Sequence, residues 1–532
     1  MRSTPLRQEM VQTGMEGGAA LIDVVICVHN QLDAVKKCLD SVRRTKTTQD
    51  FNLIVIDDGS DQTTRQYLGE FSKRYPCTII RNEKARGYTA SANQGLKQST
   101  SRYCILLNSD TIVPPHWLDR LTETMESDQR IGIVGPLSNA ASWQSVPSMD
   151  SSKNGLGPNM TLDQMAELVY QASEKIFPRA MFLNGFCLMI KREVIERIGY
   201  LDETNFPIGY GEEDDYCLRA RGANFKLKIA THCYIFHQKS ASFGSARRLQ
   251  LARSGKAALF RKHGMKEVKR SIQKMVDHQH LKETRAKIKW LLECKQQIHK
   301  GKQKKNVIYT AITGNYDRLQ APVRKSKNCD YYCFTDNPLL RSSSWKIIVL
   351  GKIFADPARQ ARWVKIMPHL FFQDYEHSVW VDGNIRVIGD IDAFIEKYSS
   401  PFPSAFYKHS LRNCIYKEAE ACITLKKDKK DVILKQISKY KKAGYPPGNG
   451  LIESGVILRR HNDAGVIQTM TAWWRQIISY SKRDQISFNY IAWKTKTPFT
   501  LIDDNIRDNK FFKWSKHHQK STVDRKKTGR RR

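Results

Sequence analysis

Short apolar runs alternate with amphipathic stretches along the first half of the chain. Near-continuous apolar runs occupy residues 22–28, 52–56, 78–80 and 103–107, and residues 32–42 repeat apolar positions at helical spacing. Strands that alternate with helices in this way predict βαβ units and a parallel, doubly wound sheet. We therefore expect an α/β domain in which the carboxyl ends of successive strands share one edge.

Polar residues follow three of these runs, at the point where each predicted strand ends. They are His29 and Asn30, then Asp57 and Asp58, and then Asn108, Ser109 and Asp110. A carboxylate at a sheet edge suits a divalent cation that in turn holds a diphosphate. An aspartate that simply caps the next helix is the structural alternative for Asp110. Neither a Walker-type loop nor Gly-x-Gly-x-x-Gly follows the first run, which disfavours an ATP loop or a dinucleotide fold.

Four consecutive acids, Glu212 to Asp215, precede an apolar pattern at helical spacing. Such acids stabilise a helix amino terminus through its dipole. They also suit catalysis, in which one carboxylate acts as a general base and another orients an acceptor. Further along, His237 ends the segment 233–237, where it is either structural or a further metal ligand.

Several of these segments occur in a set order along the chain, namely 24–30, 54–60, 86–95, 106–114, 184–186 and 211–219, followed by His237. In this order they resemble glycosyltransferase family 2 over about residues 20–265. The resemblance implies a GT-A fold that binds a nucleotide-sugar donor and transfers the sugar with inversion. By position it implies that Glu213 is the catalytic base, flanked by Glu212 and Asp215, and that Asp110 and His237 bind Mg²⁺ or Mn²⁺. The implied donor-binding residues are His29, Asp57, Asp58, Gly87, Asn93 and Asn108. One departure is Asn108, which replaces the first acid of Asp-x-Asp and lowers the charge offered to a cation.

A second predicted domain begins at the apolar run 306–312 and repeats this arrangement. The strand 378–381 ends in Asp382, Gly383 and Asn384, which is either an ordinary Asp-Gly turn or a cation site. Residues 306–515 resemble a glycosyltransferase-like family of plant mucilage and cell-wall proteins and of bacterial polysaccharide loci. By the same reasoning as for the first domain, Asp382 would hold a cation with help from Asn384, and Arg362 and Lys365 would face the phosphates. Glu453, Asp484 and Gln485 are acceptor-side or catalytic candidates, and Trp473 and Trp474 either stack on sugar or, as we favour, pack in the core.

Composition narrows the remaining possibilities. The chain has 532 residues, of which 40% are hydrophobic, and a net charge of +35. No run approaches the ~18 apolar residues that span a bilayer, and residues 1–20 lack the apolar core of a signal peptide, so we expect a cytoplasmic protein. The basic excess carries no nucleic-acid motif, so nucleic acid is disfavoured and peripheral contact with an anionic inner membrane surface is preferred. The 12 scattered cysteines predict free, buried thiols.

We therefore expect an α/β protein with two GT-A-like domains joined by a basic helical connector. The predicted parts are a disordered leader (1–20), the family 2 domain (21–265), the connector (266–305), the second domain (306–515) and a basic tail (516–532). The expected function is sugar transfer from a nucleotide-sugar to a glycan or lipid-linked saccharide acceptor in surface polysaccharide biosynthesis, with both domains active. The alternative is one catalytic domain plus a glycan-binding or scaffolding domain.

Overall fold

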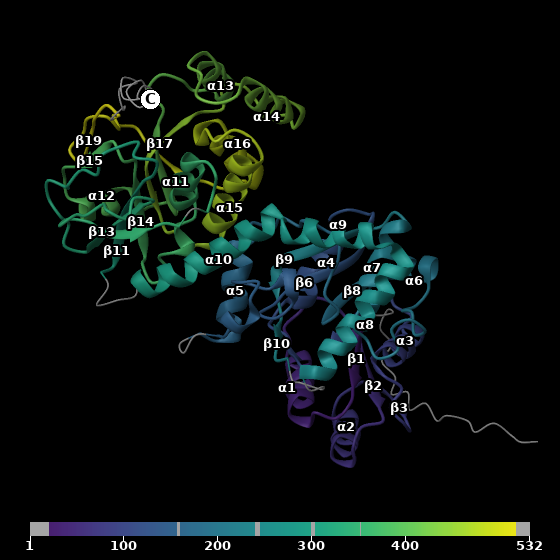
Figure 1. Ribbon diagram of the computed structural model, residues 1–532. Coiled ribbons are helices and arrows are strands. Elements are labelled where there is room, and N and C mark those ends of the chain that lie inside the picture. Colours follow the sequence, from purple (N-terminus) through teal and green to yellow (C-terminus); the bar gives the residue numbers. More distant parts are fainter. Residues whose placement is uncertain (1–20, 157–159, 240–244, 299–303, 352, 518–532) are drawn as a thin grey trace, which may run out of the picture. The chain divides into compact units, whose positions relative to one another are not determined.

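A computed structural model describes residues 21–156, 160–239, 245–298, 304–351 and 353–517. The predicted leader and residues 518–532 of the predicted tail lie outside these described ranges. The chain forms two compact units (Figure 1). Unit 1 contains the residues up to Ser145, Met149–Ala166 and Ile176–His278, and unit 2 contains Val146–Ser148, Glu167–Lys175 and the residues from Gln279 onward.

Unit 1 is built on an eight-stranded sheet in the order β3-β2-β1-β4-β8-β6-β9-β7. The first four strands in this order are parallel, and β8 runs antiparallel to both β4 and β6. The strands are β1 (Ile22–Val28), β2 (Phe51–Asp58), β3 (Thr78–Asn82), β4 (Tyr103–Asn108), β6 (Ile131–Leu137), β7 (Arg179–Ala180), β8 (Cys187–Lys191) and β9 (Lys226–Tyr234). A separate two-stranded sheet pairs β5 (Thr111–Ile112) with β10 (Phe236–His237).

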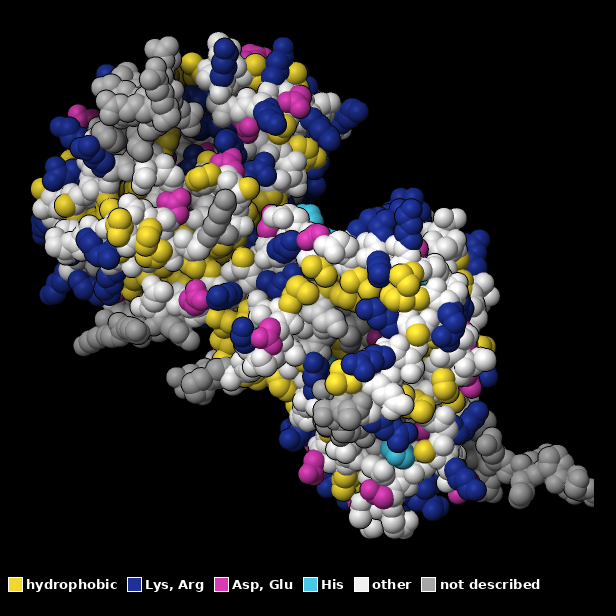
Figure 2. Space-filling model, viewed as in Figure 1, with side chains coloured by type: hydrophobic (Ala, Val, Ile, Leu, Met, Phe, Trp, Pro, Cys, Tyr) yellow, Lys and Arg dark blue, Asp and Glu magenta, His cyan; other side chains and the backbone are white. Residues whose placement is uncertain are grey.

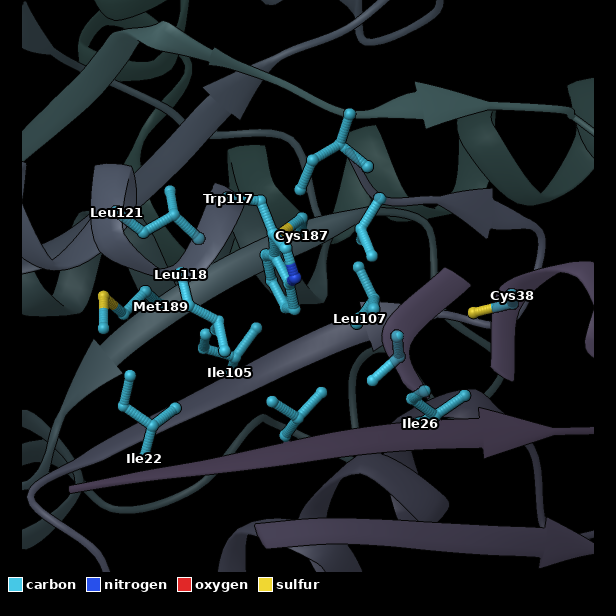
Figure 3. Packing of buried hydrophobic residues seen from close by; sticks show 14 of the residues in the cluster. Ile22, Ile26, Cys38, Ile105, Leu107, Trp117, Leu118, Leu121, Cys187 and Met189 are labelled. Atoms are coloured by element: carbon cyan, nitrogen blue, oxygen red, sulfur yellow. The ribbon is translucent and has the colours of Figure 1, made fainter. Parts of the chain in front are cut away.

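Helices cover this sheet because their apolar positions recur on one side. In α1, for example, Val35, Leu39 and Val42 are buried while the intervening lysines are exposed. Trp117 packs among the strand side chains Ile105, Leu107 and Met189 in the main core (Figure 3). The helices are α1 (Leu32–Arg43), α2 (Gln62–Arg74), α3 (Tyr88–Gln98), α4 (Trp117–Met125), α6 (Arg192–Ile198), α7 (Glu212–Gly222), α8 (Ser245–His263) and α9 (Met265–Val276). Helix α5 (Leu162–Ala172) is divided between the units, with its residues up to Ala166 in unit 1 and the rest in unit 2.

Unit 2 repeats the strand order of unit 1, with the sheet β13-β12-β11-β14-β17-β16-β18. Four parallel strands are again followed by an antiparallel one, β17. The strands are β11 (Asn306–Ile312), β12 (Cys329–Thr335), β13 (Lys346–Val349), β14 (His377–Val381), β16 (Ser404–Lys408), β17 (Ile452–Arg459) and β18 (Thr500–Ile502), with the separate pair β15 (Ile385–Val387) and β19 (Phe512–Trp514). The helices are α10 (Gln279–Ile298), α11 (Pro357–Ile366), α12 (Ile391–Tyr398), α13 (Ile415–Thr424), α14 (Lys430–Lys442), α15 (Ala464–Ser479) and α16 (Phe488–Thr495).

The expected α/β class with two sheet-containing domains is confirmed. The residues predicted to connect the domains form α9, which belongs to unit 1, and α10, which belongs to unit 2. All 12 cysteines are free thiols, as predicted. Trp473 and Trp474 are fully buried, which confirms that they pack in the core.

Two surface properties bear on the expected location. Among the described residues, no helix combines the length and the apolar character that crossing a membrane requires. Lys and Arg side chains are spread over the visible faces of both units (Figure 2). The basic excess is therefore not confined to the predicted connector and tail.

Candidate functional site

Strand register brings the polar strand ends of unit 1 to one edge of the sheet. Cys27 of β1 lies beside Ile56 of β2 and Asn108 of β4 in the parallel ladders. The residues that follow these positions, among them Asp58 and Asp110, therefore emerge at the same edge. This is the juxtaposition expected from the βαβ crossovers.

The side chain of Asp58 organises the loop that leads into α3. Its carboxylate accepts hydrogen bonds from the backbone N–H groups of Arg86 (2.8 Å) and Gly87 (2.9 Å) and from the amide of Asn82 (2.9 Å). The ring of His29 bonds to the Asp58 carbonyl through Nδ1 at 2.8 Å. A carboxylate offers about four lone-pair positions, so Asp58 keeps capacity for one further donor.

Two other predicted donor-binding residues are tied into the fold. Asp57 pairs with Arg81 and accepts from the backbone N–H of Ser60 at 3.0 Å. The buried amide of Asn93 donates to the Leu201 carbonyl (2.9 Å) and to Glu203 (2.7 Å), and its oxygen accepts from the Leu201 N–H (2.8 Å). These bonds give both side chains a structural role, and donor contact by either one stays a prediction.

Asp110 and His237 face each other across the turn before β5. The Nε2 atom of His237 lies 3.2 Å from Oδ1 of Asp110, and its Nδ1 lies 3.1 Å from the carbonyl oxygen of Ala140. Because that carbonyl can only accept, Nδ1 carries a proton in this contact, and in the tautomer protonated at Nδ1 alone Nε2 presents a lone pair toward Asp110. In that tautomer the imidazole and the carboxylate are two facing acceptors, which fit a shared cation such as Mg²⁺ or Mn²⁺.

The protein supplies only part of a coordination sphere at this turn. Within the described ranges, no group of three or more His, Cys, Asp or Glu side chains has metal-binding geometry. The neutral Asn108 at the end of β4 adds no charge. A cation at Asp110 and His237 would therefore take its remaining ligands from substrate or water.

The segment Gly185-Phe186 joins this turn to the acids of α7. Phe186 stacks on His237 with ring centroids 5.4 Å apart and accepts from the Asn108 N–H at 2.9 Å. A Cβ on Gly185 would lie only 3.3 Å from the Cβ of Glu213. Glycine at this position therefore lets Glu213 pack beside the segment that contacts Asn108 and His237.

The four acids of α7 divide into two environments. Burial, and then the charge of Glu213, raises the pKa of Glu212 well above its ordinary value. Burial also raises the pKa of Glu213, whose Oε2 accepts from the Gly211 N–H at 3.2 Å. The pKa of Asp214 is raised by burial and by Glu213. A carboxylate with a raised pKa is a stronger base, which suits the role predicted for Glu213.

Asp215 instead forms an ion-pair network. Its carboxylate lies 2.7 Å from each of Arg219, Lys262 and His263. Burial opposes ionisation of Asp215, but the bonds from these three side chains outweigh it and lower its pKa. The network joins α7 to α8 and gives Asp215 a structural role, and a part for Asp215 in catalysis stays a prediction.

In unit 2, Lys365 lies at the centre of a buried polar network. Its Nζ donates to Asp484 (2.7 Å), Asp382 (3.2 Å) and Ser454 (3.1 Å), and Nε of Arg362 lies 3.1 Å from Asp484. Burial lowers the pKa of Lys365 although both aspartates oppose this. Burial would raise the pKa of Asp484, but Arg362 and Lys365 hold it far below its usual range.

The other predicted residues of unit 2 have different partners. Asn384 donates through Nδ2 to the Ser515 carbonyl at 3.0 Å. Glu453 accepts from the hydroxyl of Ser410 at 2.9 Å, and the amide of Gln485 bonds weakly to the Ile452 carbonyl at 3.4 Å. The structure thus brings Arg362, Lys365, Asp382 and Asp484 together. Asn384, Glu453 and Gln485 each contact other residues instead.

Sequence reasoning missed two residues of this network. The hydroxyl of Ser454 donates to Asp484 at 2.9 Å, and the Trp380 indole donates to Asp382 at 2.7 Å. Ser454 directly follows the predicted Glu453 on β17, and side chains alternate between the two faces of a strand. This alternation could have predicted that Ser454 lies on the opposite face of β17 from Glu453.

Comparisons with known proteins agree with both predicted resemblances. Residues 23–199 match the model of glycosyl transferase family 2, and residues 292–517 match the TOD1/MUCI70 glycosyltransferase-like domain. Glu213 and His237 lie beyond residue 199, so their roles stay predictions.

Two curated relatives illustrate the separate matches. The probable hexosyltransferase MUCI70 of Arabidopsis thaliana is 26% identical over 237 residues, which cover 38% of this chain and 40% of that protein. A poly-beta-1,6-N-acetyl-D-glucosamine synthase of Staphylococcus aureus is 22% identical over 245 residues, which cover 45% of this chain and 56% of that protein. The chain thus spans about half the length of these relatives.

Among solved structures, the mannosyltransferase PcManGT from Pyrobaculum calidifontis, in complex with GDP-Man and Mn²⁺, is 14% identical. The match covers 52% of this chain and 75% of that one, with a TM-score of 0.36. A score this low does not establish a common fold, and the α/β assignment rests on the two sheets of this chain. The chain is thus similar to glycosyl transferase family 2 over residues 23–199 and to the TOD1/MUCI70 glycosyltransferase-like domain over residues 292–517.

Proposed function

We propose that the protein transfers sugar from a nucleotide-sugar donor to a glycan or lipid-linked saccharide acceptor during polysaccharide synthesis. One observation carries the proposal: in a family 2 domain, Gly185-Phe186 connects the facing pair Asp110 and His237 with Glu213. Glycosyl transfer needs a turn that binds the diphosphate and a general base, and here both would lie against one short segment. The relatives named as hexosyltransferase and polysaccharide synthase support the substrate class.

The residues of unit 1 divide the chemistry between them. Glu213 would take the proton from the acceptor hydroxyl, whose oxygen attacks the anomeric carbon as the bond to the diphosphate breaks, with inversion. Asp110 and His237 would hold Mg²⁺ or Mn²⁺, which when bound neutralises the departing diphosphate. Asp58 and the backbone at Gly87 would position the nucleotide, because Asp58 shapes that loop.

We further propose that the second domain also binds a nucleotide-sugar and transfers its sugar. Arg362, beside Asp484, would contact the diphosphate, and Lys365 would neutralise the neighbouring carboxylates. The candidates Glu453, Asp484 and Gln485 would act on the acceptor side. The competing arrangement is that this domain only binds or scaffolds glycan.

We also propose that the protein works at the inner face of the membrane without crossing it. The net charge of +35 and the wide distribution of Lys and Arg (Figure 2) favour attraction to anionic lipid headgroups. A lipid-linked acceptor would be held at that surface.

The test uses the full chain and a panel of nucleotide sugars, with Mn²⁺ and a saccharide acceptor. Glu213→Gln should lower the turnover of the first domain by about 10²–10⁴-fold because it removes general-base help. Donor binding, measured by thermal shift, should remain. In the wild type, activity should rise with pH through the raised pKa of Glu213, because the base must be deprotonated.

Asp214→Asn is a matched control, since it changes a neighbouring acid that has no assigned catalytic role. Unchanged turnover in Glu213→Gln would contradict the assignment of the base. Absence of any donor binding in the wild type would contradict the proposed function as a whole.

A further inference from the structure

The small sheet β5/β10 fixes the metal-binding pair of unit 1. Thr111 of β5 pairs with His237 of β10, and the N–H of Gln238 donates to the carbonyl of Asp110 at 2.9 Å. Asp110 is thus the residue directly before the paired residue Thr111 on β5, and His237 is itself the paired residue on β10. This register defines where metal ligands sit in the fold.

Unit 2 has the same small sheet in β15/β19, in the same place after the fourth parallel strand. Ile385 pairs with Trp514, and the N–H of Ser515 donates to the carbonyl of Asn384 at 2.8 Å. The register therefore makes Asn384 the counterpart of the first unit's carboxylate and Trp514 the counterpart of its imidazole.

These counterparts do not fit a divalent cation. An indole has an N–H donor and no acceptor, and a neutral amide offers no charge. The Nδ2 of Asn384 donates to the Ser515 carbonyl at 3.0 Å, which leaves the neutral amide oxygen as the one acceptor of this pair. The carboxylate and imidazole of unit 1 are therefore replaced in unit 2 by one neutral acceptor and one donor.

In unit 2 the acid of this turn is Asp382, two residues before Asn384. The ammonium of Lys365 neutralises its charge. Oδ1 of Asp382 accepts from the Trp380 indole (2.7 Å) and from Lys365 (3.2 Å), and Lys365 is fully buried. The three donors of the Lys365 ammonium are all used, on Asp382, Ser454 and Asp484. Lys365 is thus a fixed internal cation at the turn.

Arg362 has the remaining capacity for an anion. Its side chain is partly exposed and its Nε faces Asp484 at 3.1 Å. Within the described ranges, Asp484 is the ionic partner found for this guanidinium. Its two terminal nitrogens can therefore form the bidentate contact with a phosphate for which arginine is suited.

We propose that the second domain binds the diphosphate of its donor without a divalent metal, with Lys365 cancelling the turn's carboxylate and Arg362 contacting the phosphates. This inference rests on the proposed donor binding by the second domain. It gives the two domains of one chain opposite metal requirements. The metal role predicted from sequence for Asp382 and Asn384 is thereby replaced by a lysine.

One pair near the same turn is the competing cation site. Nδ1 of His517 lies 3.0 Å and 3.2 Å from the two carboxylate oxygens of Asp317. A Cβ on Gly383 would lie 3.3 Å from Oδ2 of Asp317. A metal requirement in the second domain would therefore be expected to depend on His517 or Asp382, and the experiment includes both.

The test counts sites in the full chain. The probes are Mn²⁺, followed by electron paramagnetic resonance in the presence of UDP or GDP, and the labelled nucleoside diphosphate itself, followed by equilibrium dialysis. We expect one Mn²⁺ site per chain, lost in His237→Ala and kept in Asp382→Asn and His517→Ala. We expect one diphosphate site to survive EDTA, with affinity about 10-fold or more weaker in Arg362→Met, as for loss of a charged hydrogen bond.

Arg359→Met is the matched control, because Arg359 lies on the same helix and donates to the carbonyls of Ile478 and Tyr480. It should leave the EDTA-resistant site intact. A second Mn²⁺ site that is lost in Asp382→Asn or His517→Ala would overturn the inference while leaving the proposed function in place. A single, metal-dependent diphosphate site that is lost in His237→Ala would overturn both this inference and the proposed donor binding by the second domain, because that domain would then bind no donor.

Discussion

Glu212 and Asp215 are acids on the first turn of one helix, yet their charge states are driven in opposite directions. Glu212 is buried beside another carboxylate, while Asp215 is buried against three cations. The sequence shows four acids in a row and predicts that they share a helix start. It does not separate them, because Lys262 and His263 lie far along the chain from Asp215.

The raised pKa of Glu212 makes a stability prediction. Between the unfolded and folded pKa values, the unfolded state loses its proton while the folded state keeps it, so stability falls as pH rises, by up to about 1.4 kcal/mol per pH unit. Glu212→Gln removes this loss and should be more stable than wild type at pH 8. The two melting temperatures should converge near pH 4, and a difference that does not depend on pH would contradict the assignment.

Asp215 gives the opposite pH dependence. Because its pKa is lower in the folded state, Asp215 stabilises the fold at any pH above its pKa in the unfolded state. That stabilisation is lost as the pH falls through its pKa in the folded state. Asp215→Asn should lower the free energy of unfolding at pH 7 by about 2–3 kcal/mol, as for hydrogen bonds to charged groups. Urea unfolding at pH 7 measures this, with Asp214→Asn, whose acid has a raised pKa, as the control that should not destabilise.

At the scale of elements, the apolar runs predicted β1 to β4 in unit 1 and β11 and β14 in unit 2, because buried parallel strands are nearly continuous in apolar residues. The strands β6, β16 and β17 were not predicted. The two-residue strands β5 and β10 were not predicted, since pairs this short have no periodicity. Those short strands nevertheless place Asp110 beside His237. The family resemblance could therefore identify Asp110 and His237 as a pair of ligands. The local sequence pattern could not predict that these two side chains face each other.

The loop before α3 depends on one glycine. Gly87 has φ +91°, and a Cβ there would lie 2.7 Å from the Pro207 carbonyl oxygen. Gly87→Ala should lower the free energy of unfolding by about 1–3 kcal/mol through backbone strain and weaken donor binding by displacing the N–H that Asp58 holds. Gly69→Ala in α2 meets no atom within 4 Å and should instead stabilise by about 1 kcal/mol. Equal effects in chemical unfolding would show that Gly87 has no special constraint.

At the scale of the whole chain, composition and pattern predicted two domains but not how the sequence is divided between them. Residues Glu167–Lys175 lie within the first domain's stretch of sequence, yet they belong to unit 2. There Glu174 forms a buried ion pair with Lys287 at 2.6 Å. A contact between residues this far apart leaves no local signal, so a boundary drawn along the chain could not include it.

The repeated strand order of the two units bears on whether both are catalytic. A binding or scaffolding module has no need of the buried lysine and aspartate network at the counterpart of the turn that carries Asp110. We therefore expect Glu213→Gln and, at limiting donor concentration, Arg362→Met each to slow one of two sugar additions, and the double variant to slow both. Mass spectrometry of the acceptor products separates these cases, because each addition has its own mass. If Glu213→Gln alone removes every addition when acceptors for both steps are supplied, the second domain does not transfer sugar.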